Sequence, residues 1–326
     1  MKVCVVGAGS WGTALAIHAG RAGLETVLWA RDPRVVDAIA RGRRHPKRHP
    51  DAELPSNVRG TADAREAARA DLGVLAVPSP ALPGALEAIG PVPGGVRFLS
   101  AIKGFEVETG RRVSEVVASL HPRCAFAVLS GPTFADGVVR GDPTAAVVAS
   151  SDPLTAETIQ RELSSESFRL YQSDDVVGVE LAGGLKNVVA IAAGIVVGLG
   201  LGPNTTAALM TRGLAEITRL VLARGGREKT LSGLAGVGDL MLTCTGPQSR
   251  NRRVGERIGR GESPAEAMAA VAETAEGTRA CLAASRMAAE SGIEMPINEA
   301  VRRVLYEGLS PREAVRELMT RDLRSE

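Results

Sequence analysis

The sequence feature that most restricts the fold is a glycine motif near the start of the chain. Val3-Cys-Val-Val6 is a short apolar run typical of a buried strand, and Gly7, Gly9 and Gly12 follow it directly. A helical pattern and a second apolar run, at 26–29, complete a predicted strand–helix–strand unit. Glycines at this spacing allow a tight turn and let a diphosphate approach the N–H groups that begin the helix. The motif therefore predicts dinucleotide binding, with a plain glycine-rich turn as the alternative.

Strand patterns continue through the first half of the chain. Further apolar runs, separated by helical segments, lie at 71–77, 96–102, 124–129 and, as the last of the series, 144–149. This alternation predicts an α/β Rossmann-like domain with a doubly wound parallel sheet. Ligands of such sheets bind beyond the carboxyl ends of the strands, where Lys103 and the segment Gly131–Ala135 are expected. A structural lysine is the alternative reading of Lys103.

The residues after the second strand bear on the choice of cofactor. An acidic residue there suits the ribose diol of NAD, whereas an arginine suits the 2′-phosphate of NADP. The chain offers Arg31 and then Asp32, and the arginine can also stack on adenine. We expect NAD or NADP, with NADP modestly favoured.

Composition excludes several function classes. The net charge of +2 and an aromatic content of 3% leave no footprint for nucleic-acid binding. The four cysteines are widely scattered, which fits reduced thiols better than disulfides or a metal site. The longest uncharged apolar run, 188–202, is shorter than the ~20 residues that span a bilayer. The basic segment 41–50 is interpreted as a solvated surface loop, with a phosphate or nucleic-acid contact as the alternative.

The second half of the chain has a different character. Beyond the polar stretch at 171–175 strand patterns give way to helical ones, so we place a boundary between residues 173 and 174. The sequence thus predicts an NAD(P)-binding domain over 1–173 and an all-α substrate or catalytic domain over 174–326. All four histidines lie in the first half, so a proton donor from the second must be a lysine or an acidic residue.

Lys186 is the strongest catalytic candidate in the helical half. It lies with Asn187 in an apolar helical stretch rich in small residues, 178–195. The chain has 39 lysines and arginines, of which only five are lysine. Lysine can lose its proton whereas arginine cannot, and burial lowers the pKa of an amine. A lysine at the edge of a core helix, with its amine in solvent, is the alternative.

Three polar groups accompany this lysine. Asp239 lies in a glycine-rich apolar segment, either as a helix N-cap or as the partner of a catalytic cation. Ser249 has the pattern of an N-cap, and Arg250 and Asn251 follow it in the first turn, which indicates an anion site or else a surface charge run. Glu276 precedes another helix, where it caps the helix or accepts a hydrogen bond from a ligand.

Several motifs together resemble one family along nearly the whole chain. The segments GAGSWGTALA, SGPTFA, GGLKNVVAIAAGI, NTTAALMTRGLAE, AGVGDLMLTCT and QSRNRR occur in this order. The sequence is similar to the bacterial NAD(P)-dependent glycerol-3-phosphate dehydrogenases. The resemblance implies reversible reduction of dihydroxyacetone phosphate to sn-glycerol 3-phosphate, a cytoplasmic supply of the phospholipid precursor, and no integral membrane contact. The oligomeric state is left open, with a homodimer as one outcome.

The resemblance also implies roles for individual residues. Lys186 is the proton donor and acceptor, with Asp239 as its catalytic partner. Contacts with the substrate are expected from Lys103, Gly131, Thr133, Lys186, Asn187, Asp239, Ser249, Arg250 and Asn251. Contacts with the cofactor are expected from Gly7, Gly9, Ser10, Trp11, Gly12, Arg31, Lys103, Ala135, Arg250 and Glu276.

Two places depart from the family pattern. A tyrosine-leucine-proline-glycine loop is usual around 48–54, where this chain has Arg-His-Pro-Asp-Ala-Glu-Leu. Asp136-Gly137 stands where a charged pair such as lysine-glutamate is common. The first departure puts the contacts between this loop and the cofactor in doubt. Neither departure touches the predicted catalytic residues.

Other functions fit part of the pattern. A β-hydroxyacid dehydrogenase also places a lysine beside an asparagine on a helix, and Arg250 with Asn251 would then bind a carboxylate. A redox sensor that only binds a dinucleotide needs neither a buried lysine nor a second anion site. Competition between dihydroxyacetone and its phosphate separates the two enzymes.

Overall fold

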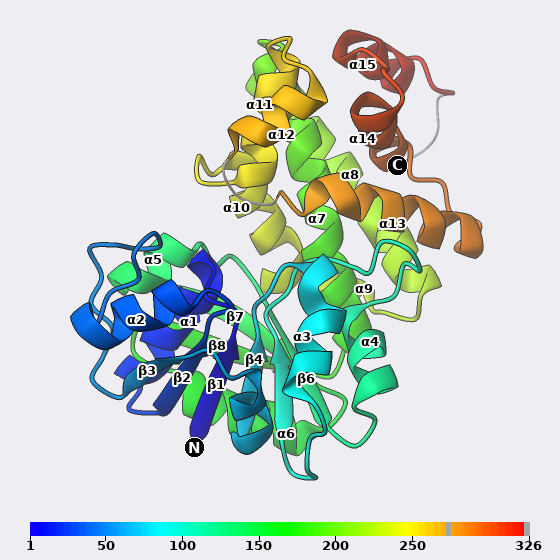
Figure 1. The fold of residues 1–326 in the computed structure, drawn as a ribbon. Helices are drawn as coiled ribbons and strands as arrows, with labels where there is room; N and C mark the ends of the chain where they lie inside the picture. Colours follow the sequence, from blue (N-terminus) through cyan, green and yellow to red (C-terminus); the bar gives the residue numbers. More distant parts are fainter. Residues whose placement is uncertain (272–274, 323–326) are drawn as a thin grey trace. The chain divides into compact units, whose positions relative to one another are not determined.

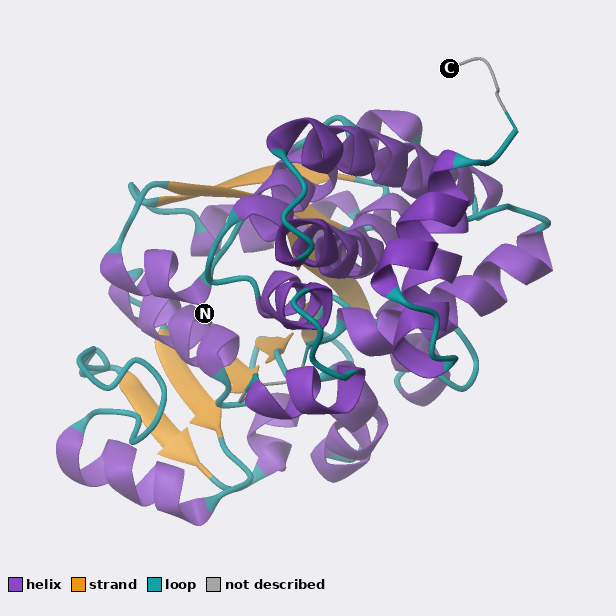
Figure 2. Cartoon of the chain, turned by 90° about the horizontal axis from the view of Figure 1, so that it is seen from above, coloured by secondary structure: helices purple, strands orange, loops and turns teal. Residues whose placement is uncertain are grey.

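The chain forms two compact units (Figure 1), and the computed structural model describes residues 1–271 and 275–322. We call residues 1–103 and 112–180 the first unit, and residues 104–111 and 181–326 the second unit. All the strands of the described residues, orange in Figure 2, belong to the first unit. An α/β first part followed by a helical second part is confirmed as the fold class.

The first unit is built on one eight-stranded sheet with the order β3-β2-β1-β4-β5-β6-β7-β8. Its strands are β1 (Lys2–Val6), β2 (Glu25–Trp29), β3 (Val58–Thr61), β4 (Leu72–Leu75), β5 (Arg97–Ser100), β6 (Ala125–Ser130), β7 (Thr144–Ala149) and β8 (Phe168–Ser173). Neighbouring strands are parallel except for β6 and β7. The order reverses at β1, which lies between β2 and β4, so the switch point of the sheet is at the carboxyl ends of β1 and β4.

The two edge strands differ from the sequence prediction. The run at 144–149 is not the last strand, because β8 follows it at one edge, and β3 lies at the other edge. In β8 buried residues alternate with exposed ones, and the polar Gln172 and Ser173 end it. An edge strand that faces solvent lacks the continuous apolar run of a buried strand, so these segments gave no clear signal.

Helices cover both faces of the sheet. Along β1, Val3 and Val5 face one apolar layer while Cys4 and Val6 face the other. The first layer is completed by α1, α5 and α6, and the second by the 3₁₀ turn 64–69, α3 and α4. The bounds are α1 (Ser10–Arg21), α2 (Pro33–Gly42), α3 (Leu82–Ile89), α4 (Val113–Leu120), α5 (Ala135–Arg140) and α6 (Pro153–Leu163).

The second unit contains only helices and loops among its described residues. Its helices are α7 (Val176–Gly198), which begins in the first unit, α8 (Pro203–Ala223), α9 (Glu228–Leu231), α10 (Asp239–Thr245), α11 (Arg250–Gly259), α12 (Pro264–Ala270), α13 (Gly277–Ser291), α14 (Pro296–Tyr306) and α15 (Pro311–Met319). The sequence pattern missed α9 and α10. A π-helical turn, Leu234–Gly238, precedes α10, and its two glycines break the apolar periodicity.

Helix α7 is the core of the second unit. It is apolar on all sides, and in the described chain it is the one helix with the length and hydropathy of a membrane span. Its most apolar window is 89% buried within the protein, so it is a core helix. Two of its glycines face the two glycines of α11. A Cβ on Gly194 or Gly198 would overlap backbone of α11, and one on Gly255 or Gly259 would overlap backbone of α7. The two helices therefore pack backbone against backbone.

Candidate active site

The glycine-rich loop joins β1 to α1 and gives each glycine a separate task. Gly7 has a φ of +118°, and a Cβ on it would lie 2.9 Å from the backbone of Ala76. A Cβ on Gly12 would overlap the carbonyl oxygen of Gly7. At Gly9, in contrast, an added Cβ meets no atom within 4 Å. Packing therefore requires the first and third glycines, whereas the absent side chain of Gly9 leaves the backbone open to a ligand.

The start of α1 has the properties of a phosphate site. Gly9 is the N-cap and offers no side-chain cap, so the first N–H groups of the helix, from Ser10 onward, have no carbonyl partner within it. Helix N-termini attract anions through these groups and through the helix dipole. The indole Nε1–H of Trp11 is buried without a hydrogen-bond acceptor. These features fit the diphosphate of a dinucleotide.

At the end of β2 the acidic candidate is already engaged. Asp32 caps α2: its carboxylate accepts from the backbone N–H of Arg34 at 3.0 Å and from the guanidinium of the same residue at 2.9 Å. The hydrogen bonds from the Arg34 side chain are the main reason that the pKa of Asp32 is lowered. Arg31 lies beside this pair and is exposed.

Lys103 and the loop after β6 form a polar cluster in the first unit. Nζ of Lys103 donates to the carbonyl oxygen of Gly131 at 2.9 Å and to Oγ1 of Thr133 at 3.4 Å. Gly131 has a φ of +150°, and a Cβ there would lie 2.8 Å from Cα of Ala146. Because β5 and β6 are parallel neighbours, the segments that follow them emerge at the same edge of the sheet. The cluster thus arises from the strand order.

Lys186 lies in a buried cluster in the second unit. Its ammonium forms an ion pair with Asp239 and donates to Oγ1 of Thr243 at 2.7 Å. The Thr243 hydroxyl donates in turn to the carbonyl oxygen of Asp239 at 2.6 Å, so its lone pairs remain for the ammonium. Lys186 is 4% exposed and Asp239 is 1% exposed. The ion pair offsets the desolvation of both charges, and Asp239 is not the N-cap of α10, a position held by Gly238.

A chain of hydrogen bonds ties Asn187 to the start of two helices. Nδ2 of Asn251 donates to Oδ1 of Asn187 at 2.9 Å, and Oδ1 of Asn251 accepts from the N–H of Gly277 at 2.9 Å. Ser249 caps α11, as its sequence predicts, by accepting from the N–H of Arg252 at 3.2 Å. The first turns of α11 and α13 are therefore fixed relative to α7.

The structure places the remaining predicted residues at the ends of elements. Arg250 is exposed as the first residue of α11, and Ala135 is the first residue of α5. Glu276 directly precedes α13 and makes no side-chain capping bond, so the capping alternative is wrong for this residue. Each unit thus holds its own group of predicted residues.

Sequence reasoning missed Thr243 and misjudged the basic segment. Thr243 follows Asp239 by one helical turn, a spacing that would have revealed it had α10 been expected. In the segment 41–50, Arg41, Arg44 and Lys47 are exposed, but His45 is 4% exposed and bonds with backbone of the glycine-rich loop. The segment is therefore not simply a solvated loop.

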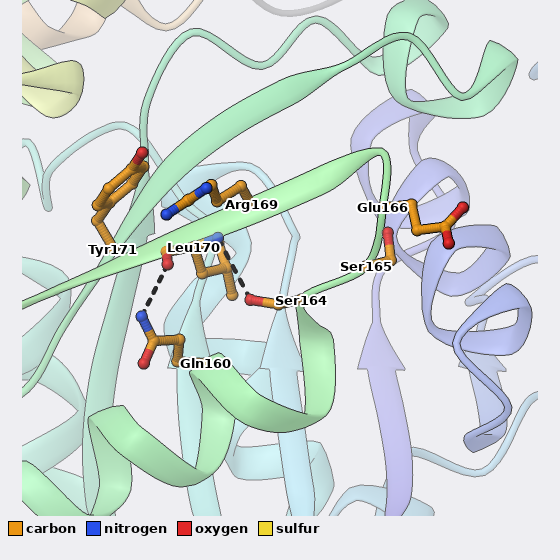
Figure 3. Close-up of a pocket in the computed structure, with 7 residues that line it drawn as sticks. All are labelled: Gln160, Ser164, Ser165, Glu166, Arg169, Leu170 and Tyr171. Atoms are coloured by element: carbon orange, nitrogen blue, oxygen red, sulfur yellow. Dashed lines mark hydrogen bonds between the residues drawn. The ribbon is translucent and has the colours of Figure 1, made fainter.

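An open hollow at the edge of the sheet is a different place from these clusters (Figure 3). It is lined by Gln160, Ser164, Ser165, Glu166, Arg169, Leu170 and Tyr171, none of which is a predicted site residue. Gln160 donates to the carbonyl oxygen of Leu170 at 2.8 Å, and the N–H of Leu170 donates to Ser164 at 3.3 Å. These hydrogen bonds belong to the packing of α6 against β8, and we assign the hollow no chemistry.

Comparison with known proteins agrees with this arrangement. The family model described as the N-terminus of NAD-dependent glycerol-3-phosphate dehydrogenase matches residues 2–156, and the model of its C-terminus matches residues 175–316. A protein named glycerol-3-phosphate dehydrogenase [NAD(P)+] from Thioalkalivibrio sulfidiphilus is 48% identical over 99% of this chain and 98% of its own length. One of the same name from Geobacter sulfurreducens is 47% identical, covering 100% and 98%.

Solved structures agree as well. The crystal structure of glycerol-3-phosphate dehydrogenase from Coxiella burnetii superposes with a TM-score of 0.94 at 38% identity, covering 98% of this chain and 99% of that one. The yeast glycerol-3-phosphate dehydrogenase GPD1 gives a TM-score of 0.83 at 26% identity, covering 96% and 98%. With both halves matched and full-length relatives near half identical, the chain belongs to the NAD-dependent glycerol-3-phosphate dehydrogenase family.

Proposed function

We propose that Lys186 is the proton donor and acceptor of an NAD(P)-dependent glycerol-3-phosphate dehydrogenase. The reaction is the reversible reduction of dihydroxyacetone phosphate to sn-glycerol 3-phosphate, so the protein is an oxidoreductase acting on a CH–OH group. The observation that carries the proposal is the buried Lys186–Asp239–Thr243 cluster. A buried cation whose partners hold it in one position is what proton delivery to a defined atom requires.

The residues of the cluster divide the work. When bound, NAD(P)H supplies the hydride, and the protein handles one proton. Protonated Lys186 polarises the ketone of the substrate and gives its proton to the forming alkoxide. Asp239 holds the ammonium, and Thr243 orients it through the 2.7 Å hydrogen bond. Burial raises the pKa of the neighbouring Cys244 thiol to about 12, so this thiol does not compete as a proton acceptor.

We assign substrate binding to the anion-binding groups among the predicted residues. The start of α11 offers backbone N–H groups to a phosphate, and the fork of Arg250 adds paired donors. Asn251, held by Asn187 and Gly277, is rigid before any ligand arrives. We assign the same substrate to Lys103, Gly131, Thr133 and Ser249, whose polar groups are held by backbone.

Cofactor binding is assigned chiefly to the first unit, with residues 1–173 as the NAD(P) domain and 174–326 as the substrate domain. The proposed contacts are those of Gly7, Gly9, Ser10, Trp11, Gly12, Arg31, Lys103, Ala135, Arg250 and Glu276. NAD and NADP both fit, and we favour NADP modestly because Asp32 is committed to Arg34 while Arg31 is exposed. Arg31→Ala should weaken the binding of NADPH more than that of NADH, and fluorescence titration measures both affinities. Equal losses of affinity for the two cofactors would contradict the preference for NADP.

The central experiment is Lys186→Met in the full chain. We expect kcat/KM with dihydroxyacetone phosphate to fall by about 10²- to 10⁴-fold, the usual range for loss of a general acid. NADH affinity should persist, since the glycine-rich loop is intact. Lys229→Met is the matched control, because Lys229 is exposed in the same unit and should leave turnover unchanged. Substantial turnover in a folded Lys186→Met enzyme would rule out the assignment.

The same assay tests the second candidate. If unphosphorylated hydroxyacids are turned over and the phosphate gives no advantage, the β-hydroxyacid dehydrogenase reading is favoured.

We further propose a cytoplasmic enzyme, because the apolar helix α7 is buried and Cys4, Cys244 and Cys281 are buried free thiols. For the homodimer, light scattering of the purified protein decides between one and two copies.

A further inference from the structure

The two departures from the family pattern meet in the structure. Nδ1 of His49, in the first departure, lies 3.0 Å from Oδ1 of Asp136, in the second. Nε2 of the same ring lies 2.9 Å from the carbonyl oxygen of Ser10, at the start of α1. The His49 side chain is 7% exposed. His49 and Asp136 therefore form a pair that contacts the start of α1 through the Ser10 carbonyl.

A second histidine contacts the same loop. Nε2 of His45 lies 3.0 Å from the carbonyl oxygen of Ala8. Its Nδ1 accepts from the backbone N–H groups of Lys47 and Arg48 at 3.1 and 3.0 Å. The proton of the neutral ring must then be on Nε2, where it is donated to Ala8. Burial lowers the pKa of His45, in agreement with a neutral ring.

These contacts orient the N–H groups that face a diphosphate. A carbonyl and the N–H of the next residue belong to one planar trans peptide unit and point in opposite directions. A bond to the Ala8 carbonyl therefore fixes the N–H of Gly9, and a bond to the Ser10 carbonyl fixes the N–H of Trp11. Both N–H groups lie at the start of α1, where helices bind phosphate.

Both ring nitrogens of His49 face oxygen atoms that can only accept hydrogen bonds. Each ring nitrogen lies within 3.0 Å of an oxygen that can only accept, one a carboxylate and one a carbonyl. A neutral imidazole has one N–H and serves one of them, whereas the imidazolium serves both. His49 also has a φ of +47°, a left-handed conformation that is unusual for a non-glycine residue and that these contacts help to hold.

We propose that the His49–Asp136 pair is a positioning device for the cofactor diphosphate, complete only when His49 is protonated. It holds the Ser10–Trp11 peptide unit in its binding orientation and brings a positive charge close to the phosphates. Deprotonation releases one of the two contacts and removes the charge. Cofactor affinity is therefore greater when the His49 ring carries both protons than when it carries one. The inference rests on the proposed role of the glycine-rich loop.

The charged groups around His49 are few. Asp136 faces it from α5, and Arg140 on that helix is paired with Asp142. Its own segment contributes Lys47 and Arg48, together with the neutral His45. The first turn of α1 contributes no acidic residue. Asp136 is thus the one carboxylate in contact with the ring among the described residues.

The test is NADH binding to the whole enzyme, followed by fluorescence at about pH 6 and pH 8.5, values that bracket the ordinary titration of histidine. NADH is chosen because it lacks the 2′-phosphate of NADPH, which itself titrates in this range. For the wild type we expect the Kd at high pH to be about 3- to 10-fold weaker, the effect of one charge-assisted hydrogen bond.

Two variants and a control isolate the pair. In Asp136→Asn the low-pH Kd should rise to the wild-type high-pH value, with little further change at high pH and with kcat at saturating NADH retained. His49→Gln keeps a donor for the Ser10 carbonyl and should give an intermediate, pH-independent Kd. Asp142→Asn removes an exposed carboxylate from the neighbouring turn and should retain the wild-type ratio.

Two results would overturn the inference. One is that Asp136→Asn retains the wild-type ratio between the Kd values at high and low pH. The other is that Asp136→Asn weakens NADH binding equally at both pH values, as a purely structural role would predict. Because Asp136 is half exposed, that variant should fold even if His49→Gln does not. If Gly9→Val leaves NADH binding intact at both pH values, the assignment of the loop to the cofactor fails as well, and that outcome is distinguishable from the other two.

Discussion

At the residue scale the proposed proton transfer rests on two buried charges, Lys186 and Asp239, that form an ion pair. Lys186 and Asp239 lie on different helices, 53 positions apart in sequence, and neither has more than slight exposure. Removing one partner of such a pair leaves an uncompensated charge in a medium of low polarity, which costs more than removing both. The geometry that places the proton therefore also couples these residues energetically.

This coupling gives a prediction for a double-mutant cycle. Asp239→Asn should lower the free energy of unfolding by about 3 kcal/mol, because the ammonium loses its counter-charge. Adding Lys186→Met to that variant should restore part of the loss, since no buried charge then remains. Urea denaturation of the four proteins measures the coupling. Strictly additive effects would show that the two charges do not stabilise each other.

Single residues also show where sequence reasoning ends. Lys186 could be predicted because lysine is rare in this chain and its helix is apolar. The choice between partner and cap for Asp239 could not be made, since it depends on a helix that the local pattern did not reveal. His49 carried no signal of its own, because its contacts with Ser10 and Asp136 join residues 39 and 87 positions apart.

At the element scale, one helix is capped by a side chain from another. Helix α14 begins after Met295 with no capping side chain of its own. The carboxylate of Glu216, on α8, accepts from the N–H of Ile297 at 2.7 Å and from that of Asn298 at 3.3 Å. Burial raises the pKa of Glu216 to about 7, although both backbone bonds and the charges of Arg219 and Arg321 oppose the shift.

A pH dependence of stability follows from this raised pKa. The folded state binds the Glu216 proton more tightly than the unfolded state, in which the pKa is 4.5. The contribution of Glu216 protonation to the free energy of unfolding is fully present below about pH 4.5 and decreases as the pH rises to about 7. Above that value it changes little. A shift of roughly 2.5 units corresponds to about 3 kcal/mol.

The variant Glu216→Gln separates this contribution from all others. The difference in unfolding free energy between wild type and variant should change by up to about 3 kcal/mol between pH 5 and pH 8, in favour of the wild type at the lower pH. Denaturant titrations at the two pH values measure it. Glu290→Gln, a change of an exposed carboxylate in the same unit, should show no such trend. A constant difference would mean that Glu216 does not titrate in this window.

Capping could be predicted only where it is local. Ser249, Ser263 and Ser310 cap the helices that follow them, and a serine directly before a helical pattern is readable in sequence. Glu216 caps a helix that begins 80 positions later, so nothing near Pro296 indicates its cap. The same distinction separates Ser249 from Asn251, whose bond to Gly277 crosses between helices.

At the scale of the whole molecule, the sequence predicts the fold class better than the edges of the sheet. The glycine motif, the strand runs and the change to helical patterns all follow local periodicity, and the family and fold agree with them. The antiparallel pairing of β6 with β7 and the edge positions of β3 and β8 depend on pairing between distant segments. The short sequences of these strands do not specify which strand each one pairs with.

The glycine-rich loop predicts that cofactor binding and folding stability are lost separately. Gly9→Val should weaken NADH binding at least tenfold. Its unfolding midpoint should stay near that of wild type, because a Cβ at this position meets no protein atom within 4 Å. Gly12→Ala should instead lower the unfolding midpoint, because its Cβ overlaps the Gly7 carbonyl. Calorimetry and NADH titration of both variants make the comparison. Equal destabilisation would contradict the separate tasks of the two glycines.

The backbone contact between α7 and α11 has a consequence for how the gene can drift. Any single-base change in a glycine codon that alters the amino acid adds at least one side-chain carbon, and at Gly194, Gly198, Gly255 and Gly259 that carbon has no room. These four codons are therefore closed to neutral substitution. The four glycines also let α7, which carries Lys186, pack closely against α11, which begins after Ser249. The spacing between Lys186 and the start of α11 is thus inherited through positions that have no side chain.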